Sequence, residues 1–243
     1  MGTDNAPPIE SVSDLLQATL RQRMDGPAHA DTWLYRGQAR GRAALIASAG
    51  RIPALTSGAD EDLRMFRAWK QRASFYERTI PGRDWEALAV AAHHGLATRL
   101  LDWSLNPLVA LFFSVLAPPD EEPEADGAFF VFRVERVIDV ERDRIGEVAQ
   151  VAVLFPAGHT HRVIRQRGAF TYHPDPRQPL ELCERQLSRH PVPRRAKHRL
   201  RTELDRLGIN HEMLFPDLEG FSRHLNWLAR VHGATPGLPD ADD

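Results

Sequence analysis

Cysteine is almost absent from this chain of 243 residues, and lysine is scarce. The single cysteine, Cys183, excludes an internal disulfide and a metal cage built from several thiolates. Lys70 and Lys197 are the only lysines, so nearly all basic residues are arginines. The 31 basic and 33 acidic residues give a net charge of −2, which neither favours nor excludes a nucleic-acid partner.

Long hydrophobic runs are also lacking. The most apolar stretch, residues 107–117 (PLVALFFSVLA), is far shorter than the roughly 20 residues that a membrane-spanning helix needs. The first ten residues show no basic segment followed by an apolar run, so we expect no signal peptide. We therefore expect a cytoplasmic protein without a membrane partner. Its 42% hydrophobic and 26% charged residues exclude a wholly disordered chain and suffice for a sizeable core.

Hydrophobic spacing and capping signals predict one α+β domain over residues 10–232, between flexible tails at 1–9 and 233–243. Helices are expected around Leu15–Leu20, at 60–78, at 85–94 with Asp84 as N-cap, from Pro107, at 195–207 and at 217–231. Strands are expected at 32–36, 128–134, 148–155 and 168–173. Helices dominate the first half and strands the middle, which favours a single mixed or antiparallel sheet with packed helices.

The densest group of polar residues lies at 91–107 (AAHHGLATRLLDWSLNP), between two apolar segments. Buried polar groups need partners, because burial without a hydrogen bond costs several kcal/mol. One interpretation is an Arg99–Asp102 ion pair that stabilises the connection. The other is the edge of a pocket, in which Arg99 holds an anion and His94 transfers or orients a proton.

Two further segments could contribute to a site. In WLYRGQ (33–38), Arg36 ends a predicted strand beside Gly37, which permits close approach of a ligand or backbone. Arginine can bind phosphate through two hydrogen bonds, although an edge arginine paired with a carboxylate would look the same. In residues 162–173, Gln166 and Arg167 precede Gly168 and a strand, which also fits a simple turn or bulge.

The sequence gives little support for a metal site or for a nucleic-acid-binding segment. Neither the adjacent His93 and His94 nor the pair His159 and His161 comes with a third ligand at suitable spacing, so no metal site is indicated. The basic segment 185–201 could bind nucleic acid. Without interleaved aromatic residues it is more typical of a solvated helix face.

Five segments, in this order, resemble the FRG domain, which is named for a Phe-Arg-Gly motif. YRGQ (35–38) resembles the name-giving motif with Tyr35 in place of Phe, and LIASAGR (45–51) resembles the element that follows it. The family's longest motif, Gln-His-x-Gly-Leu-Pro-Thr-Arg-Leu-Leu-Asp-Trp-Thr, resembles residues 92–104, with Ala92, Ala97 and Ser104 as substitutions. RQRGAFTYH (165–173) and LFPDLEGFSRHL (214–225) resemble two later elements.

The resemblance implies a bacterial protein with a role in phage defence or in a toxin-like system. Arg36 in its Tyr-Arg-Gly context also resembles the first motif of ADP-ribosyltransferases, which implies that fold and NAD as a substrate. On this interpretation Arg36 holds a phosphate or ribose, and Asp102 orients Arg99 or stabilises the ribosyl cation. The residues then expected at the nucleotide are Tyr35, Arg36, Gln38, Arg51, Thr98, Arg99, Trp103 and Phe170, and the candidate catalytic residues are His94, Asp102 and Gln166.

The sequence has neither a Ser-Thr-Ser motif nor a clear Gln/Glu-x-Glu motif on a late strand. Two alternatives therefore stay open. One is a non-catalytic module that senses a nucleotide or nucleic acid, with a protein or nucleic acid as target. The other is a purely structural polar network, with carboxylates such as Glu61 or Glu77 neutralising the arginines. The functional interpretations predict that Arg36, Arg51, Arg99, Asp102 and Gln166 surround one concavity.

Overall fold

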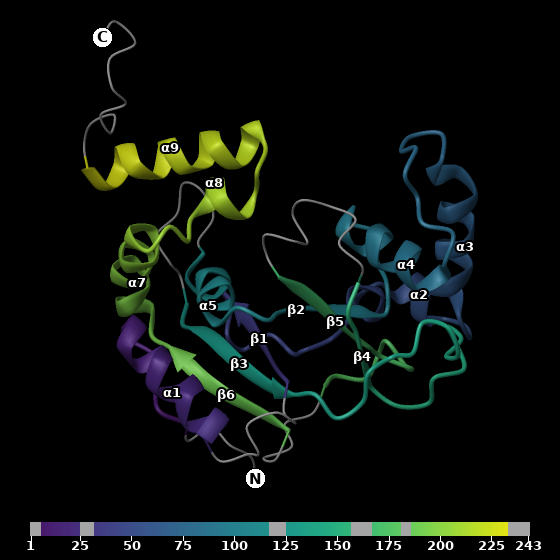
Figure 1. Cartoon of the computed structure of the whole chain (residues 1–243), viewed down its shortest axis with the longest axis horizontal. Helices are drawn as coiled ribbons and strands as arrows, with labels where there is room; N and C mark the ends of the chain where they lie inside the picture. Colours follow the sequence, from purple (N-terminus) through teal and green to yellow (C-terminus); the bar gives the residue numbers. More distant parts are fainter. Residues whose placement is uncertain (1–5, 25–31, 117–124, 157–166, 181–185, 233–243) are drawn as a thin grey trace, which may run out of the picture.

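The structure is a computed structural model that describes residues 6–24, 32–116, 125–156, 167–180 and 186–232. In this part of the chain, six antiparallel strands form one sheet in the order β4-β5-β2-β1-β3-β6. This confirms the expected α+β class with helices packed on a single sheet (Figure 1).

The strands are short and the helices mostly one to four turns long. The strands are β1 (Trp33–Gln38), β2 (Leu100–Ser104), β3 (Gly127–Arg133), β4 (Ala152–Leu154), β5 (Gly168–Tyr172) and β6 (Leu187–Val192). The helices are α1 (Val12–Met24), η1 (Ser48–Arg51), α2 (Pro53–Thr56), α3 (Glu61–Ala73), α4 (Asp84–His93), α5 (Pro107–Val115), α7 (Arg194–Arg206), α8 (His211–Leu214) and α9 (Leu218–His232).

The two faces of the sheet are covered differently. On one face, α5 packs against β1 and β3 in a cluster that includes Tyr35 and Phe129, while α4 packs against β2 and β5 in a second cluster. On the other face, Leu34, Trp103 and Phe130 form a third cluster, closed by loop residues such as Leu45 and Leu180. Figure 1 shows α3 and α4 on the opposite side of the molecule from α7 and α1.

Local capping signals account for one helix start and mislead at another. The Asn106 side chain accepts a hydrogen bond from the Leu108 N–H at 3.0 Å, with Pro107 in the first turn, as the sequence predicts. The prediction that Asp84 is an N-cap is wrong, because Arg83 occupies that position. Asp84 is the first residue of the helix, where its negative charge interacts favourably with the positive end of the helix dipole. Its carboxylate also binds Lys70 Nζ at 2.6 Å.

Several predicted boundaries also need correction. Helix α3 ends at Ala73 rather than near 78, because turn hydrogen bonds from the N–H groups of Phe75 and Tyr76 end it. Strands β2 and β6 were not predicted from the sequence. The end of the predicted tail 1–9 is packed against the domain, since Ile9 is buried and its N–H donates to Pro191 O at 2.8 Å.

In the described residues, no helix combines the length and apolarity that crossing a membrane requires.

Candidate functional site

Strands β1 and β2 separate soon after they meet. In these two strands only Tyr35 and Ser104 are paired. Asp102 lies opposite Phe170 of β5. Along an antiparallel ladder, successive residues of a strand direct their backbone groups alternately to one neighbour and to the other. At Asp102 the backbone carbonyl is directed away from β5 and towards β1. That carbonyl accepts a hydrogen bond from Arg36 Nη1 at 2.5 Å, and the same nitrogen lies 3.9 Å from Asp102 Oδ2. A side chain thus takes the place of a backbone partner in the gap between the strands, which we call the Arg36 gap.

The Arg36 gap contains two buried polar atoms without partners. Within the described residues, Arg36 Nε and Gln38 Oε1 are shielded from solvent and make no hydrogen bond. Both side chains leave β1 on the same face, since they are two residues apart. Burial lowers the pKa of Arg36, the Asp102 charge opposes this shift, and the nearby Arg51 charge reinforces it. An arginine still stays charged in such surroundings, so the gap holds a cation with a donor that no described residue uses.

Arg51 is the last residue of η1, and η1 is hydrogen-bonded to the start of β2. Ser48 Oγ accepts a hydrogen bond from the Thr98 N–H at 3.0 Å, and the Ala49 N–H donates to Thr98 O at 3.0 Å. Arg51 is exposed, and its Nε donates to Ile46 O at 3.3 Å. Thr98 is itself buried: its backbone is bound to η1, and its Oγ1 accepts a hydrogen bond from the Leu100 N–H at 3.2 Å.

A buried histidine completes the neighbourhood of Arg36. Trp103 Nε1 donates to Thr171 Oγ1 at 2.9 Å, and Thr171 Oγ1 lies 3.0 Å from His173 Nε2. Burial and the positive charge of Arg36 lower the pKa of His173 to about 4, against a partial opposing effect of the Gln178 backbone. His173 is therefore neutral at pH 7. His173 was not predicted as a site residue, because its closeness to Arg36 depends on the pairing of β5 with the unpredicted strand β2.

We expect the free energy of unfolding to fall as the pH drops from about 6.5 to about 4. In this range His173 is protonated in the unfolded chain but stays neutral in the folded one. The unfolded state then binds more protons, and the loss from this residue reaches roughly 2–3 kcal/mol by pH 4.5. Urea unfolding of the wild type and His173→Gln at pH 7 and 4.5 measures the effect. Equal pH dependence of both proteins would contradict the assignment.

Arg99 belongs to a different network, and the predicted Arg99–Asp102 pair is wrong. The Arg99 guanidinium binds Asp62 through two hydrogen bonds, from Nε at 2.7 Å and from Nη2 at 2.5 Å. Nη2 also donates to Asp60 at 2.9 Å, and Nη1 donates to Tyr172 OH at 3.3 Å. Burial lowers the pKa of Arg99, but the hydrogen bonds and charge of Asp62 outweigh it and raise that pKa. Two carboxylates therefore already match this cation, and its predicted contact with a nucleotide stays a prediction.

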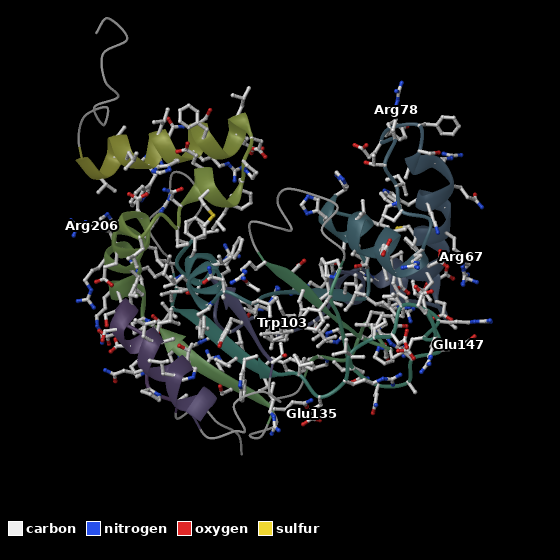
Figure 2. The ribbon with its side chains drawn as sticks, in the orientation of Figure 1. Arg67, Arg78, Trp103, Glu135, Glu147 and Arg206 are labelled. Carbon is white, nitrogen blue, oxygen red and sulfur yellow. The ribbon has the colours of Figure 1, made fainter. Side chains whose placement is uncertain are left out.

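The other predicted residues are dispersed. Tyr35 and Phe170 are buried in the clusters under α5 and α4, on the sheet face opposite to Trp103. Trp103 lies near the middle of the molecule in Figure 2 and is almost fully buried. His94 is exposed at the end of α4, where its charge acts on Glu77.

Of the five residues predicted to surround one concavity, the structure brings only some near one another. Arg36, Asp102 and Arg51 come together, with Gln38 beside Arg36, while Arg99 binds Asp62 elsewhere. Gln166 lies outside the described residues. The carboxylates suggested as neutralising partners are also engaged elsewhere, since Glu61 binds Arg64 and Glu77 binds Thr79.

The fold and the arginine-lined gap define an α+β domain built around a split between two strands. Residues 31–122 match the family model of the FRG domain, so the chain contains an FRG domain. The matched range includes Arg36, Gln38, Arg51 and Asp102, whereas His173 lies beyond it. Comparison with curated proteins and with solved structures gave no match.

Proposed function

We propose that the FRG domain binds a phosphate-bearing nucleotide at the Arg36 gap, with NAD as the first candidate. The observation that carries the proposal is the buried Nε of Arg36, which lacks a hydrogen-bond partner among the described residues. Leaving a charged donor buried and unsatisfied costs more than leaving a neutral one, so such a group in a folded protein calls for a partner. A phosphate oxygen fits, because guanidinium groups bind phosphates through paired, charge-assisted hydrogen bonds.

The local charge balance favours an anion. Arg36 and Arg51 lie close enough for one charge to depress the pKa of the other. Among the described residues, Asp102 is the only carboxylate within 4 Å of Arg36, at 3.9 Å, and its side chain is 75% exposed. Water screens such a pair strongly, so positive potential remains in the gap.

The Gln38 side chain indicates which chemical groups the ligand carries besides phosphate. Its Oε1 lacks a donor, and it lies on the same face of β1 as Arg36. A ribose hydroxyl or a carboxamide N–H could supply that donor while a phosphate reaches Arg36. A ribosyl phosphate therefore offers an acceptor for Arg36 Nε and a donor for Gln38 Oε1.

Cleavage of NAD is a second candidate, carried by the exposed carboxylate of Asp102 beside Arg36. When the bond between the ribose and nicotinamide breaks, nicotinamide leaves with the bonding electrons and the ribose carbon becomes cationic. A carboxylate held close to that carbon stabilises its charge until water or a target nucleophile adds. Nicotinamide release by the wild type, lost in Asp102→Asn with binding retained, would support this candidate. Binding without release would leave a non-catalytic nucleotide sensor.

We expect Arg51→Gln to weaken NAD binding about tenfold or more, because it removes one of the two cations without disturbing the core. A charge-assisted hydrogen bond contributes about 1.5–3 kcal/mol. Calorimetric titration with NAD, ATP and adenosine measures the effect, and adenosine, which has no phosphate, should bind weakest.

Arg42→Gln is the matched control, since Arg42 is an exposed arginine in the segment between β1 and η1. It should bind NAD as the wild type does. No heat and no change in melting temperature with any nucleotide at millimolar concentration would reject the proposal and favour the structural interpretation.

A further inference from the structure

A second surface lies at the turn after α3, away from the Arg36 gap. Phe75 and Tyr76 are adjacent in this turn and are 85% and 90% exposed. The turn is ordered by backbone hydrogen bonds from Phe75 to Arg72 O and from Tyr76 to Ala73 O, both 3.0 Å. Two neighbouring aromatic rings are thus held in solvent on a defined backbone, which costs hydrophobic free energy unless something covers them.

A hollow of about 550 Å³ adjoins Tyr76. Met65, Trp69, Arg72 and Tyr76 line it from α3 and the turn, and Leu96 closes it from the segment after α4. The spacing of three or four residues places the α3 side chains on one face of that helix. The hollow therefore has aromatic walls, an apolar floor and a guanidinium, a combination suited to a flat, polar-edged ring.

The charge around this hollow is positive. Residues 64–78 contain five basic residues and one acidic residue, in a chain whose net charge is −2. Arg64 and Lys70 are matched by Glu61 and Asp84. In the described residues, neither Arg72 nor Arg78 has a carboxylate within 4 Å. Figure 2 shows Arg78 projecting at this end of the molecule, while Arg206 projects from the opposite side.

We propose that this surface binds single-stranded nucleic acid, with bases stacked on Phe75 and Tyr76 and phosphates paired with Arg72 and Arg78. Exposed aromatic rings interleaved with basic residues are how proteins bind single strands without reading their sequence, since every base offers a flat face. The basic segment 185–201 lacks such rings. A membrane surface would also attract cations, but a hollow lined by the aromatic side chains of Trp69 and Tyr76 favours bases over lipid headgroups.

The test is fluorescence anisotropy with a labelled 12-nucleotide single-stranded RNA and its DNA equivalent at low salt. We expect Phe75→Ala/Tyr76→Ala to weaken binding at least tenfold. Arg72→Gln/Arg78→Gln should weaken binding and reduce the slope of log K against log salt by about 1.4, because each phosphate contact on a single strand contributes about 0.7. Both pairs are exposed, so the melting temperature should not change.

Arg206→Gln is the control for charge, since Arg206 is exposed on the other side of the molecule. It should leave the affinity unchanged. Failure of the wild type to bind either strand, an equal loss in Arg206→Gln, or binding to phosphatidylserine vesicles in place of the strands would each overturn the proposal. NAD titration of the Phe75→Ala/Tyr76→Ala protein keeps this result separate from the Arg36 gap, because nucleotide binding there should persist.

Discussion

Arg99→Ala should lower the free energy of unfolding by about 3–5 kcal/mol. The substitution removes a buried guanidinium that binds Asp62 through two hydrogen bonds and Asp60 through a third. The Asp62 side chain is as buried as that of Arg99, so its charge would be left in the interior without a partner. Breaking a buried ion pair by deleting one member is costly for that reason, even where the intact pair adds little net stability.

Urea unfolding of Arg99→Ala and Arg67→Ala compares the buried arginine with an exposed one in α3, which should cost under about 0.5 kcal/mol. A double-mutant cycle with Asp62→Asn and Arg99→Gln then isolates the pair. The double variant should lose less stability than the two single variants together, because it leaves no unmatched charge. Equal melting points for Arg99→Ala and Arg67→Ala would contradict the burial argument.

Local signals in the sequence were sufficient for the fold class and for several elements. The start of α5 depends on Asn106 and Pro107 themselves, so it was predictable without knowledge of any distant residue. Strand β2 was not. Its five residues, LLDWS, are short and lie between two helices, and the exposed Asp102 interrupts four buried neighbours. Only the pairing with β5, about 70 residues later, makes this segment a strand.

For the candidate site too, residues that stand in a local motif were predictable, whereas their partners in space were not. Arg36, Gln38, Arg51 and Asp102 stood out by motif. In the structure Arg36 contacts Asp102, shares one face of β1 with Gln38 and has its pKa lowered by the charge of Arg51. Which carboxylate matches which arginine was not predictable, since Asp62 precedes Arg99 by 37 residues and Asp102 follows Arg36 by 66. Tertiary contacts thus separate two arginines that looked alike in the sequence. Arg99 is matched inside the protein, while Arg36 Nε has no acceptor among the residues that the structure describes.

The glycine that follows Arg36 has a packing role that the motif alone does not reveal. Helix α5 lies directly on β1 at Gly37. A Cβ atom built there would overlap Ala110 O and lie 2.5 Å from Ser114 N, both backbone atoms of α5. Backbone cannot rotate away as a side chain can, so any larger residue must push the helix off the sheet. The close approach of α5 therefore requires glycine next to the arginine of the gap.

Gly37→Ala should accordingly destabilise the protein by about 3 kcal/mol or more, at the upper end of the usual cost of overpacking a core. It should also weaken NAD binding, because a shift of β1 moves Arg36 relative to Asp102. Gly82→Ala is the matched control, since Gly82 has open space around its Cβ position and no positive φ. That variant should be neutral or slightly stabilising, because alanine restricts the unfolded chain. Chemical unfolding of both variants measures the difference, and a Gly37→Ala protein as stable as Gly82→Ala would show that α5 can move away from β1 at little cost.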